Sequence, residues 1–349
     1  MAYRASDDPE LFDVPDYSKS ETIVVLDGDE LAYIVSAVCE QRCLVYTNTV
    51  NEVEMPFKNK TLFKKFMQGL TVPEGHFTVE EKQVAEPAQN AFSTLKAKLT
   101  KTRKKFETDN IEIYISGVDN FRDNIPLPNK YKGNRDGLIR PLLLDQCKDY
   151  LVKYHNAKVV DGVEADDWLA IRAYDGFSTG KKIIACSQDK DNLGNSGWYF
   201  NPEKENAEMM YIEGLGELYL DTSNKTPKVA GQGRKWLYYQ WIAGDSADHY
   251  EPRDIAKQLG IKLAPFGDKS ALKLLQDLNT DKECIQAVHD LFKSWYGTEF
   301  VTYTVWDGSE LTTDYVGIMQ IYLDCARMLR WENDHVKVPD MLNKMGITR

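Results

Sequence analysis

The sequence lacks any long apolar run: no stretch approaches the roughly 20 residues that a membrane-spanning helix needs. It is also poor in histidine, with five in 349 residues, and its six cysteines include no CxxC pair. This composition disfavours a zinc site, a disulfide framework and a membrane partner. We expect reduced thiols in a cytoplasmic protein. Residues 1–20 are acidic and polar, unlike a secretory signal, and predict a mobile leader.

An excess of positive charge is missing as well, because the net charge is −11. That value argues against a protein that coats nucleic acid non-specifically. It does not exclude a nucleic-acid enzyme, since basic residues are concentrated in short segments. The segment "LKAKLTKTRKKF" contains no acid, and we predict DNA contacts from its residues Lys101, Arg103 and Lys104. A second, looser basic group consists of Lys130, Lys132, Arg135 and Arg140.

Apolar strands alternate with amphipathic helices through the first two thirds of the chain. Strands are predicted at 23–26, 111–115, 157–161 and in "KKIIACSQD", a hairpin in "CLVYTNTVNEVEMPF", and helices from about 29, at 80–106, at about 138–154 and at 164–175. After about residue 230 the pattern is mainly helical. The order predicts an α/β fold with a mostly parallel central sheet flanked by helices. We expect a core over 21–230 and a helical part over 231–349 packed on it.

Acidic residues follow each predicted strand of the sheet. Asp27 ends the first strand, Asp119 lies just past the second, Glu164, Asp166 and Asp167 follow the third, Asp189 and Asp191 follow the fourth, and Asp245 and Asp248 close the next helix. Groups just beyond the carboxyl ends of parallel strands gather along one edge of a sheet, where ligands bind. The sequence therefore directs eight or nine acids toward one crevice.

Such a cluster needs cations, because carboxylates a few ångströms apart raise each other's pKa and destabilise the fold. Any one of these acids, taken alone, is explained as a helix cap or a turn residue. The joint pattern favours a metal site. Mg²⁺ prefers oxygen ligands, and two such ions about 4 Å apart can support phosphodiester hydrolysis. We therefore predict two Mg²⁺ ions, for which Mn²⁺ can substitute.

Five motifs carry a resemblance to a known family. In their order and spacing, "LDGDELAY", "YKGNR", "GVEADD", "SQDKD" and "AGDSAD" resemble the 5′–3′ exonuclease and flap endonuclease family, most closely its bacteriophage members. The resemblance covers roughly residues 21–275, with a looser echo at "ARMLRWEN". It implies a flap-endonuclease or PIN-like nuclease core, a helical arch at about 119–156 and a C-terminal helical part that binds DNA.

The resemblance also implies roles for individual residues. The ligands of the metal nearer the scissile phosphate would be Asp27, Asp119, Glu164 and Asp166, with Asp167 and Asp189 close by, and those of the second metal would be Asp191, Asp245 and Asp248. Lys132 and Arg135 resemble the family's cationic pair at the base of the arch, with Tyr131 beside them. Arg140, on the predicted helix that follows, would line the passage for the 5′ strand.

The sequence departs from the family pattern after "AGDSADHY". The family's glycine-rich helix–three-turn–helix element is only partly present, because residues 251–264 replace its first half. The piece "FGDKSALKLL" resembles the second half, with Gly267 and Lys269 near a helix N-terminus that could hold a phosphate. Residues 43–70 have no counterpart in the family pattern.

The resemblance implies hydrolysis of DNA from 5′ ends at flaps and nicked duplexes. It extends to RNA–DNA hybrids, with RNA primer removal in phage DNA replication, degradation of host DNA and replication proteins as partners. Two alternatives remain open. A haloacid dehalogenase-type phosphatase would use Asp27 as its nucleophile, but it would leave most of the acids without a task. A non-catalytic protein that binds branched DNA would carry a degenerate metal site.

Overall fold

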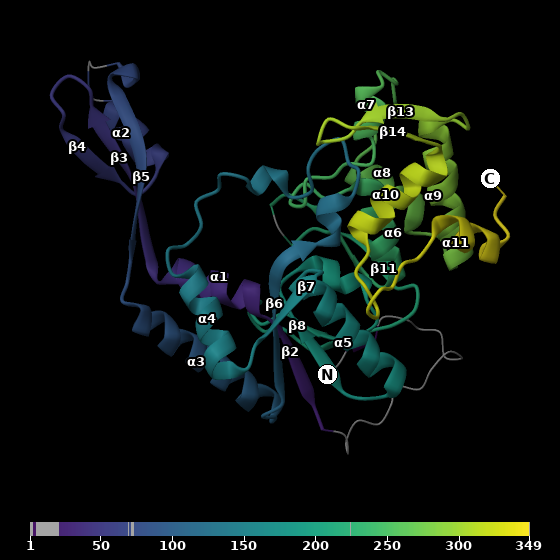
Figure 1. The fold of residues 1–349 in the computed structure, drawn as a ribbon, viewed down its shortest axis with the longest axis horizontal. Coiled ribbons are helices and arrows are strands. Elements are labelled where there is room, and N and C mark those ends of the chain that lie inside the picture. The colour runs from purple at the N-terminus through teal and green to yellow at the C-terminus, as the bar shows by residue number, and fades with distance from the viewer. Residues whose placement is uncertain (1–2, 5–20, 69, 71–72, 224, 349) are drawn as a thin grey trace. The chain divides into compact units, whose positions relative to one another are not determined.

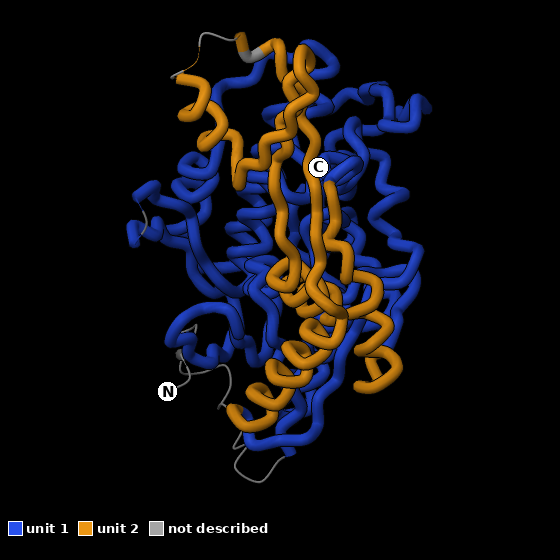
Figure 2. Tube along the Cα trace, turned by 90° about the vertical axis from the view of Figure 1, so that its left-hand side faces the viewer, with its two compact units in different colours: residues 1–27, 106–138, 158–349 blue, residues 28–105, 139–157 orange. Residues whose placement is uncertain are grey.

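The computed structural model describes residues 3–4, 21–68, 70, 73–223 and 225–348. The predicted leader lies outside these residues apart from the short strand β1 (Tyr3–Arg4), so it stays a prediction. The chain divides into two compact units, coloured in Figure 2: unit 1 comprises residues 1–27, 106–138 and 158–349, and unit 2 comprises residues 28–105 and 139–157. The boundary predicted near residue 230 falls inside unit 1.

Unit 1 is built on a seven-stranded sheet in the order β1-β10-β9-β8-β2-β6-β7 (Figure 1). Its other strands are β2 (Ile23–Asp27), β6 (Ile111–Asn120), β7 (Lys158–Gly162), β8 (Ile183–Cys186), β9 (Gly197–Phe200) and β10 (Met210–Ile212). All neighbouring pairs are parallel except β9 with β10. The predicted mostly parallel sheet is confirmed.

Helix α5 (Ala165–Thr179) covers one face of this sheet. Its Leu169 packs with Val25 of β2, Val160 of β7 and Ile183 of β8, and all four side chains are buried. The β-branched residues of these short strands suit a sheet that is buried on its faces. The predicted strands and this helix are confirmed to within a few residues, because their apolar runs are continuous and end at acidic or glycine-containing turns.

The rest of unit 1 is mainly helical, as predicted. Its helices are α6 (Arg234–Ala243), α7 (Asp254–Gln258), α8 (Asp268–Leu275), α9 (Asp281–Tyr296), α10 (Tyr315–Ala326) and α11 (Val338–Met345). They share a large apolar core that includes Trp241, Phe292 and Tyr322. The prediction missed two antiparallel hairpins, which pair β11 (Glu217–Asp221) with β12 (Lys228–Gln232) and β13 (Val301–Thr304) with β14 (Glu310–Thr313).

Unit 2 combines helices with a three-stranded antiparallel sheet in the order β4-β3-β5. Its elements are α1 (Gly28–Val38), β3 (Glu40–Asn48), β4 (Glu54–Phe57), α2 (Lys60–Met67), β5 (Phe77–Ala85), α3 (Ala88–Phe106) and α4 (Leu144–His155). The hairpin predicted over residues 43–57 is confirmed as β3 and β4. The ring of Phe63 stacks on Tyr46 and meets Phe57 edge-on, so aromatic packing holds α2 against this sheet.

Three sequence expectations were wrong. The helix predicted over 80–106 is divided, because β5 ends at Ala85 and α3 begins after Pro87. The helix predicted from 138 begins at Leu144, because a residue that precedes a proline avoids the helical region; Arg140 precedes Pro141 and is therefore not on a helix. Asp119 does not lie past its strand but within β6, beyond a β-bulge that begins after Ser116.

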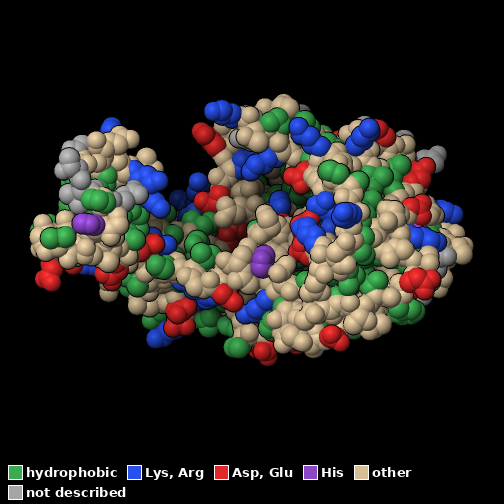
Figure 3. Space-filling model, turned by 90° about the horizontal axis from the view of Figure 1, so that it is seen from above, with side chains coloured by type: hydrophobic (Ala, Val, Ile, Leu, Met, Phe, Trp, Pro, Cys, Tyr) green, Lys and Arg blue, Asp and Glu red, His purple; other side chains and the backbone are tan. Residues whose placement is uncertain are grey.

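All six cysteines are free thiols, five of them buried, as predicted. No helix among the described residues is long and apolar enough to cross a membrane. On the face shown in Figure 3, Lys and Arg side chains are interspersed with Asp and Glu. That face therefore carries no continuous field of one sign, in keeping with a moderately acidic chain.

Candidate active site

Parallel strands and the starts of the segments after them carry the acids of the candidate site. β2 ends at the buried Asp27, and β8 is followed by a loop that reaches Asp189 and Asp191. Glu164 is the N-cap of α5 in an extended conformation, so Asp166 and Asp167 fall in the first helical turn. Acids favour this position because the helix dipole is positive there. This topology places Asp27, Glu164, Asp166 and Asp189 at or just beyond the carboxyl ends of strands of the sheet.

A first group of acids surrounds Asp166. Its Oδ1 is sealed from solvent and has no hydrogen-bond partner in the structure. Burial and the charges of Asp27, Asp189 and Glu164 raise the pKa of Asp166 well above its ordinary value. A carboxylate in such surroundings is stabilised by a proton or by a cation. Four acids from three separate segments of unit 1 therefore act on one another here.

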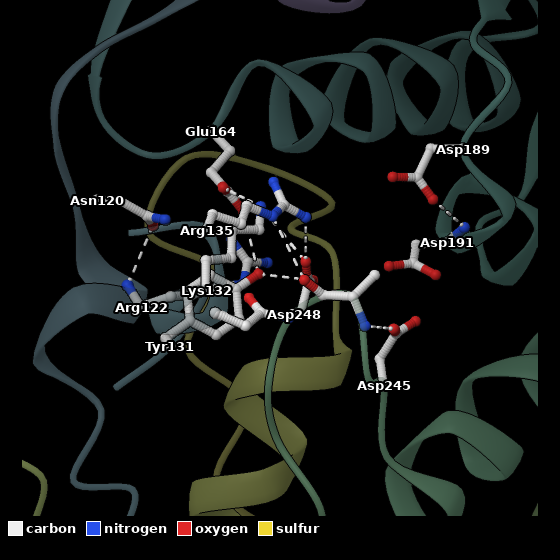
Figure 4. Close-up of polar contacts among 12 residues, drawn as sticks. Asn120, Arg122, Tyr131, Lys132, Arg135, Glu164, Asp189, Asp191, Asp245 and Asp248 are labelled. Atoms are coloured by element: carbon white, nitrogen blue, oxygen red, sulfur yellow. Dashed lines mark hydrogen bonds and ion pairs between the residues drawn. The ribbon is translucent and has the colours of Figure 1, made fainter. Parts of the chain in front are cut away.

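A second group of acids surrounds Asp191. Burial and then the charges of Asp189, Asp248 and Asp245 raise the pKa of Asp191 to about 8. Gln240 of α6 donates a hydrogen bond to its carboxylate. Asp189 accepts the Asp191 backbone N–H at 2.9 Å. Asp189 therefore shapes this turn, and its charge also raises the pKa of Asp191. Asp189, Asp191 and Asp245 lie together on one side of the site in Figure 4.

Basic side chains stand among these acids. The Lys132 Nζ contacts Glu164 and lies 3.7 Å from Asp248 Oδ1, so it bridges the two groups. Arg135 is paired with Asp248 at 2.9 Å, and Lys190 with Asp245 at 2.7 Å. Burial lowers the pKa of Lys132, but the charges of Glu164 and Asp248 outweigh it and leave that pKa raised. The ammonium is therefore held in its charged form. Figure 4 shows Lys132 beside Glu164 and Asp248.

The "YKGNR" loop is fixed against the "GDSAD" loop by backbone contacts. Lys132 adopts a left-handed conformation, with φ of 52°, and its N–H donates to the Asp248 carbonyl at 2.9 Å. Asn134 donates to the Ser246 carbonyl at 2.8 Å. Two motifs more than 100 residues apart are therefore hydrogen-bonded together on one side of the site.

The predicted DNA contact of Tyr131 stays a prediction, and in this structure the residue contacts two acids of the site. Its side chain is buried, and its hydroxyl donates to Asp248 at 2.8 Å and lies 3.2 Å from Glu164. Burial raises the pKa of Tyr131 well above its ordinary value, and the Glu164 and Asp248 charges add to that rise. The phenol therefore stays protonated and orients two acids, and its ring is not available to stack on a base.

Asp167 also differs from its predicted place among the metal ligands. It is fully buried, and Arg122 binds both of its oxygens, at 2.6 and 2.9 Å. Sequence reasoning missed Arg122, because a lone arginine in "DNFRDN" gives no signal of burial. The Arg122 and Asp167 side chains form an ion pair behind the site.

The other predicted residues belong to other segments of the chain. Asp119 is exposed on β6; burial raises the pKa of Asp123, and the charges of Glu164 and then Asp119 add to that rise. Gly267 and Lys269 stand at the N-terminal end of α8, beside a hollow lined by Leu220, Pro227 and Val229. Lys101, Arg103 and Lys104 lie on α3, and Arg140 lies in the loop before α4, all in unit 2.

The side chains of the site decide whether a divalent metal fits there. Among the described residues, no three acidic, histidine or cysteine side chains are placed closely enough to hold an ion. Lys132 and Lys190 occupy positions between the carboxylates instead. The donor chemistry nevertheless fits Mg²⁺, because the groups are carboxylates and the buried Asp166 Oδ1 lacks a partner. A metal would replace the lysines as the counter-ion.

No family model matches the chain, and no curated protein matches it. Among solved structures, the bacteriophage T5 flap endonuclease in a pseudo-enzyme–product complex with DNA and metal ions aligns with a TM-score of 0.46 at 13% identity, covering 93% of this chain and 96% of that one. A T5 protein co-crystallised with metal ions aligns at 0.44 and 13%, covering 93% and 97%. A lysine-to-alanine mutant of the T5 5′-exonuclease aligns at 0.43 and 10%, covering 93% and 96%. The chain is thus similar to these phage nucleases along most of its length, at low identity.

Proposed function

We propose that this protein is a divalent-metal-dependent nuclease that hydrolyses DNA phosphodiester bonds at 5′ ends, as a 5′–3′ exonuclease and flap endonuclease. One observation carries the proposal. Acids from separate segments of unit 1 gather around the buried Asp166 and Asp191, and Asp166 Oδ1 is sealed from solvent without a hydrogen-bond partner. Such a concentration of buried negative charge is unfavourable in a merely structural role and favourable around divalent cations.

The proposed site holds two Mg²⁺ ions, which Mn²⁺ can replace. Asp27, Glu164, Asp166 and Asp189 would hold the first ion, and Asp191, Asp245 and Asp248 the second. Asp119 is exposed in this structure, and its place among the ligands stays a prediction. Asp167 is not included, because Arg122 engages both of its oxygens. When bound, Mg²⁺ supplies activation of the attacking water and neutralisation of phosphate charge.

Lys132 and Arg135 supply the positive charge for the substrate. Lys132 lies between the two acid groups, so once it is released from Glu164 and Asp248 it can reach a phosphate held at either. An ammonium beside the scissile phosphate stabilises the negative charge that develops there, and a guanidinium can hold a phosphate with two hydrogen bonds. Tyr131 keeps Glu164 and Asp248 in place during this exchange.

We propose further DNA contacts outside the acid groups. The outward face of α3 carries Lys101 and Lys104, which are exposed, with Arg103 half-buried beside them. Lys269 and the backbone at Gly267 could bind a phosphate of the duplex, and Arg140 could contact the 5′ strand. Contacts of this kind bind the backbone without reading sequence and weaken with salt.

The biological role follows from this chemistry as a proposal. A nuclease that acts on 5′ ends serves to remove RNA primers in phage DNA replication, to trim flaps, or to degrade host DNA. Hydrolysis of the RNA strand of a hybrid and contact with replication proteins belong to the same proposal.

The test is digestion of 5′-labelled flap, nicked, blunt and RNA–DNA hybrid duplexes with Mg²⁺ and with EDTA. We expect Mg²⁺-dependent cleavage, with a labelled mononucleotide from an exonuclease or a longer labelled flap from an endonuclease. Intact DNA together with hydrolysis of p-nitrophenyl phosphate would instead indicate the phosphatase. A gel shift without cleavage in either condition would indicate the DNA-binding protein.

A further inference from the structure

Arg122 is a charged side chain with almost no access to solvent, being 1% exposed. It belongs to a 3₁₀ helix (Phe121–Asn124) that follows β6 directly. Asn120 accepts the backbone N–H of Arg122 at 3.0 Å and so fixes the start of this turn (Figure 4). A guanidinium buried this deeply is tolerated only when it is paired and hydrogen-bonded. Its partners therefore indicate what the chain uses it for.

The principal partner is Asp167 of α5. The Arg122 Nη1 donates to Asp167 Oδ2 at 2.6 Å and Nη2 donates to Oδ1 at 2.9 Å, a bidentate pair with both groups buried. Asp167 also accepts the backbone N–H groups of Glu164 and Leu329, each at 3.2 Å. A carboxylate has about four lone-pair directions, and these four donors fill them. Asp167 is therefore saturated by the protein itself.

These contacts lead directly to the acids of the site. Through Asp167, Arg122 holds the backbone of Glu164 at the N-cap of α5, two residues before Asp166. The Arg122 Nη1 also lies 3.6 Å from Glu164 Oε2, so its charge acts on that carboxylate directly. Asp167 thus anchors the start of α5. The same segment carries Glu164 and Asp166, which belong to the group of acids around Asp166.

The same pair is closed by a segment from the end of the chain. Arg122 Nη2 donates to the carbonyl of Arg327 at 2.9 Å, next to the Leu329 N–H that binds Asp167. Arg327 in turn is bound to Asp334 at 2.5 Å, so the turn that presents these groups is itself fixed. A segment 162 residues after Asp167 therefore completes the surroundings of that carboxylate.

We propose that Arg122 is a positioning residue for the metal site: acting through Asp167, it fixes the first turn of α5 so that Glu164 and Asp166 are held ready for a divalent cation. The inference rests on the proposed function for the reaction that the site performs. It assigns to Arg122 and Asp167 the support of the ligands, and not contact with the metal or the substrate.

The test compares Arg122→Met with the wild-type full chain. Loss of a group that orients metal ligands typically weakens metal affinity or activity by about 10- to 100-fold. We therefore expect the Mg²⁺ concentration that half-saturates the rise in melting temperature to increase by about 10-fold or more. Turnover of a 5′-flap DNA should fall on the same scale, while its KM stays near the wild-type value. Arg122→Lys, which keeps the charge but not the fork, should fall between the two.

Arg172→Met is the matched control, because Arg172 lies on the same helix and forms a similar pair with Glu112, at 2.8 Å for both bonds. It should lower the melting temperature in EDTA and leave the Mg²⁺ dependence of that temperature unchanged. An equal loss of Mg²⁺ affinity in both variants would overturn the proposal, since any weakening of α5 would then produce it.

The double variant Arg122→Met/Asp167→Leu separates positioning from stability. Apolar replacement of a buried ion pair often preserves stability, so we expect a folded protein in EDTA. Its Mg²⁺ affinity should stay low, because nothing holds the Glu164 backbone. Recovery of wild-type Mg²⁺ affinity, or failure of the double variant to fold, would assign Arg122 to fold stability alone and overturn the proposal.

The two proposals fail in different ways. If the wild-type protein shows no Mg²⁺-dependent rise in melting temperature and cuts no DNA, the proposed function fails. If the wild-type protein responds to Mg²⁺ and Arg122→Met responds at the same concentrations, the positioning role fails while the proposed function stands.

Discussion

Lys132 occupies the place at which the two acid groups meet. Its left-handed backbone and the bond from its N–H to the Asp248 carbonyl aim the side chain at Glu164 and Asp248. Without a metal, this ammonium neutralises part of the negative charge of the site. We infer that Lys132 and a divalent cation compete for the same carboxylates, so that metal binding frees Lys132 for the substrate.

Lys132→Met tests this competition. Removal of one electrostatic stabiliser typically lowers turnover by about 100-fold or more, and we expect that decrease on a 5′-flap DNA. The Mg²⁺-induced rise in melting temperature should become larger, because no ammonium has to be displaced. Lys130→Met is the control, since Lys130 pairs with the exposed Asp136 at 3.3 Å. Wild-type turnover, or a smaller response to Mg²⁺, would contradict the account.

Asp166→Asn removes the most crowded charge of the site. We expect cleavage to be abolished while DNA binding on a gel is retained. In EDTA the free energy of unfolding should rise by about 1–2 kcal/mol, because a buried carboxylate crowded by Asp27, Asp189 and Glu164 is replaced by a neutral amide. Urea unfolding and 5′-label release provide the two measurements. Asp161→Asn, at an exposed acid of β7, should change neither, and a cutting Asp166→Asn variant would disprove the ligand assignment.

At the scale of elements, α5 is held to β6 by Arg172 and Glu112. Burial raises the pKa of Glu112, but its hydrogen bonds to Arg172 and Tyr114 outweigh burial and lower that pKa below its ordinary value. Because the pKa of Glu112 is lower in the folded state, its ionised carboxylate stabilises the fold. This stabilisation is present above the unfolded pKa of about 4.3 and disappears as pH falls through the lower folded pKa.

Glu112→Gln should therefore cost stability in a pH-dependent way. At pH 7 we expect the free energy of unfolding to fall by about 1–2 kcal/mol, the scale of hydrogen bonds to a charged group. The gap between variant and wild type should narrow as pH drops below about 4.3. Urea unfolding of both proteins in EDTA at several pH values measures this difference in unfolding free energy. A gap that stays constant would show that Glu112 contributes nothing through its charge.

Helix α9 begins with a capping box that the sequence "TDKE" specifies. Thr280 accepts the Glu283 N–H at 3.2 Å, and Glu283 accepts the Thr280 N–H at 3.0 Å. Thr280→Ala should lower the free energy of unfolding by about 1 kcal/mol, whereas Thr280→Ser should restore most of it. Thermal unfolding of the three proteins measures the difference, and equal stability of Ala and Ser variants would refute the cap.

Elements with strong local signals could be predicted from the sequence. Val24, Val25 and Leu26 form a continuous apolar run that only a buried strand explains, and the structure places them in β2. Residues 80–85 are mostly polar, so the sequence favours a helix there; their strand depends on pairing with β3, which no local pattern reveals. Short strands such as β10 depend on their neighbours in the same way.

For the site, the acid positions could be predicted because strand ends are visible in the sequence. The groups that support the acids could not. Arg122 and Gln240 reach the site through tertiary contacts, and no residue-type pattern marks them. The motifs assign roles to Tyr131 and Asp167, but burial and saturated hydrogen bonds change those roles. Motifs thus predict which residues gather and not which atoms remain available.

At the scale of the whole molecule, charge is divided between the units. Unit 1 contains the acid groups, and unit 2 contains α3, whose last turn holds Arg103, Lys104 and Lys105. This positive charge acts on a neighbouring side chain. Burial lowers the pKa of His155, and the charges of Arg103 and Lys96 lower it further. We therefore expect unit 2 to add phosphate contacts to the affinity for DNA.

Lys101→Glu/Lys104→Glu tests that contribution. The variant should bind duplex DNA more weakly, and its affinity should depend less on salt, with a slope smaller by about one for each phosphate that it no longer binds. Lys282→Glu/Lys344→Glu in unit 1 is the charge-matched control. Titrations at several salt concentrations distinguish the two variants. An equal decrease in affinity for both variants would make net charge, rather than the α3 surface, responsible.

Locating bound metal in crystals would test the proposed site most directly. Crystals of the wild-type protein soaked in Mn²⁺ should give anomalous difference peaks among Asp27, Glu164, Asp166 and Asp189 and beside Asp191, Asp245 and Asp248, with Lys132 withdrawn from Glu164. Maps without any peak among these acids, and with Lys132 still bound to Glu164 at saturating Mn²⁺, would contradict the account.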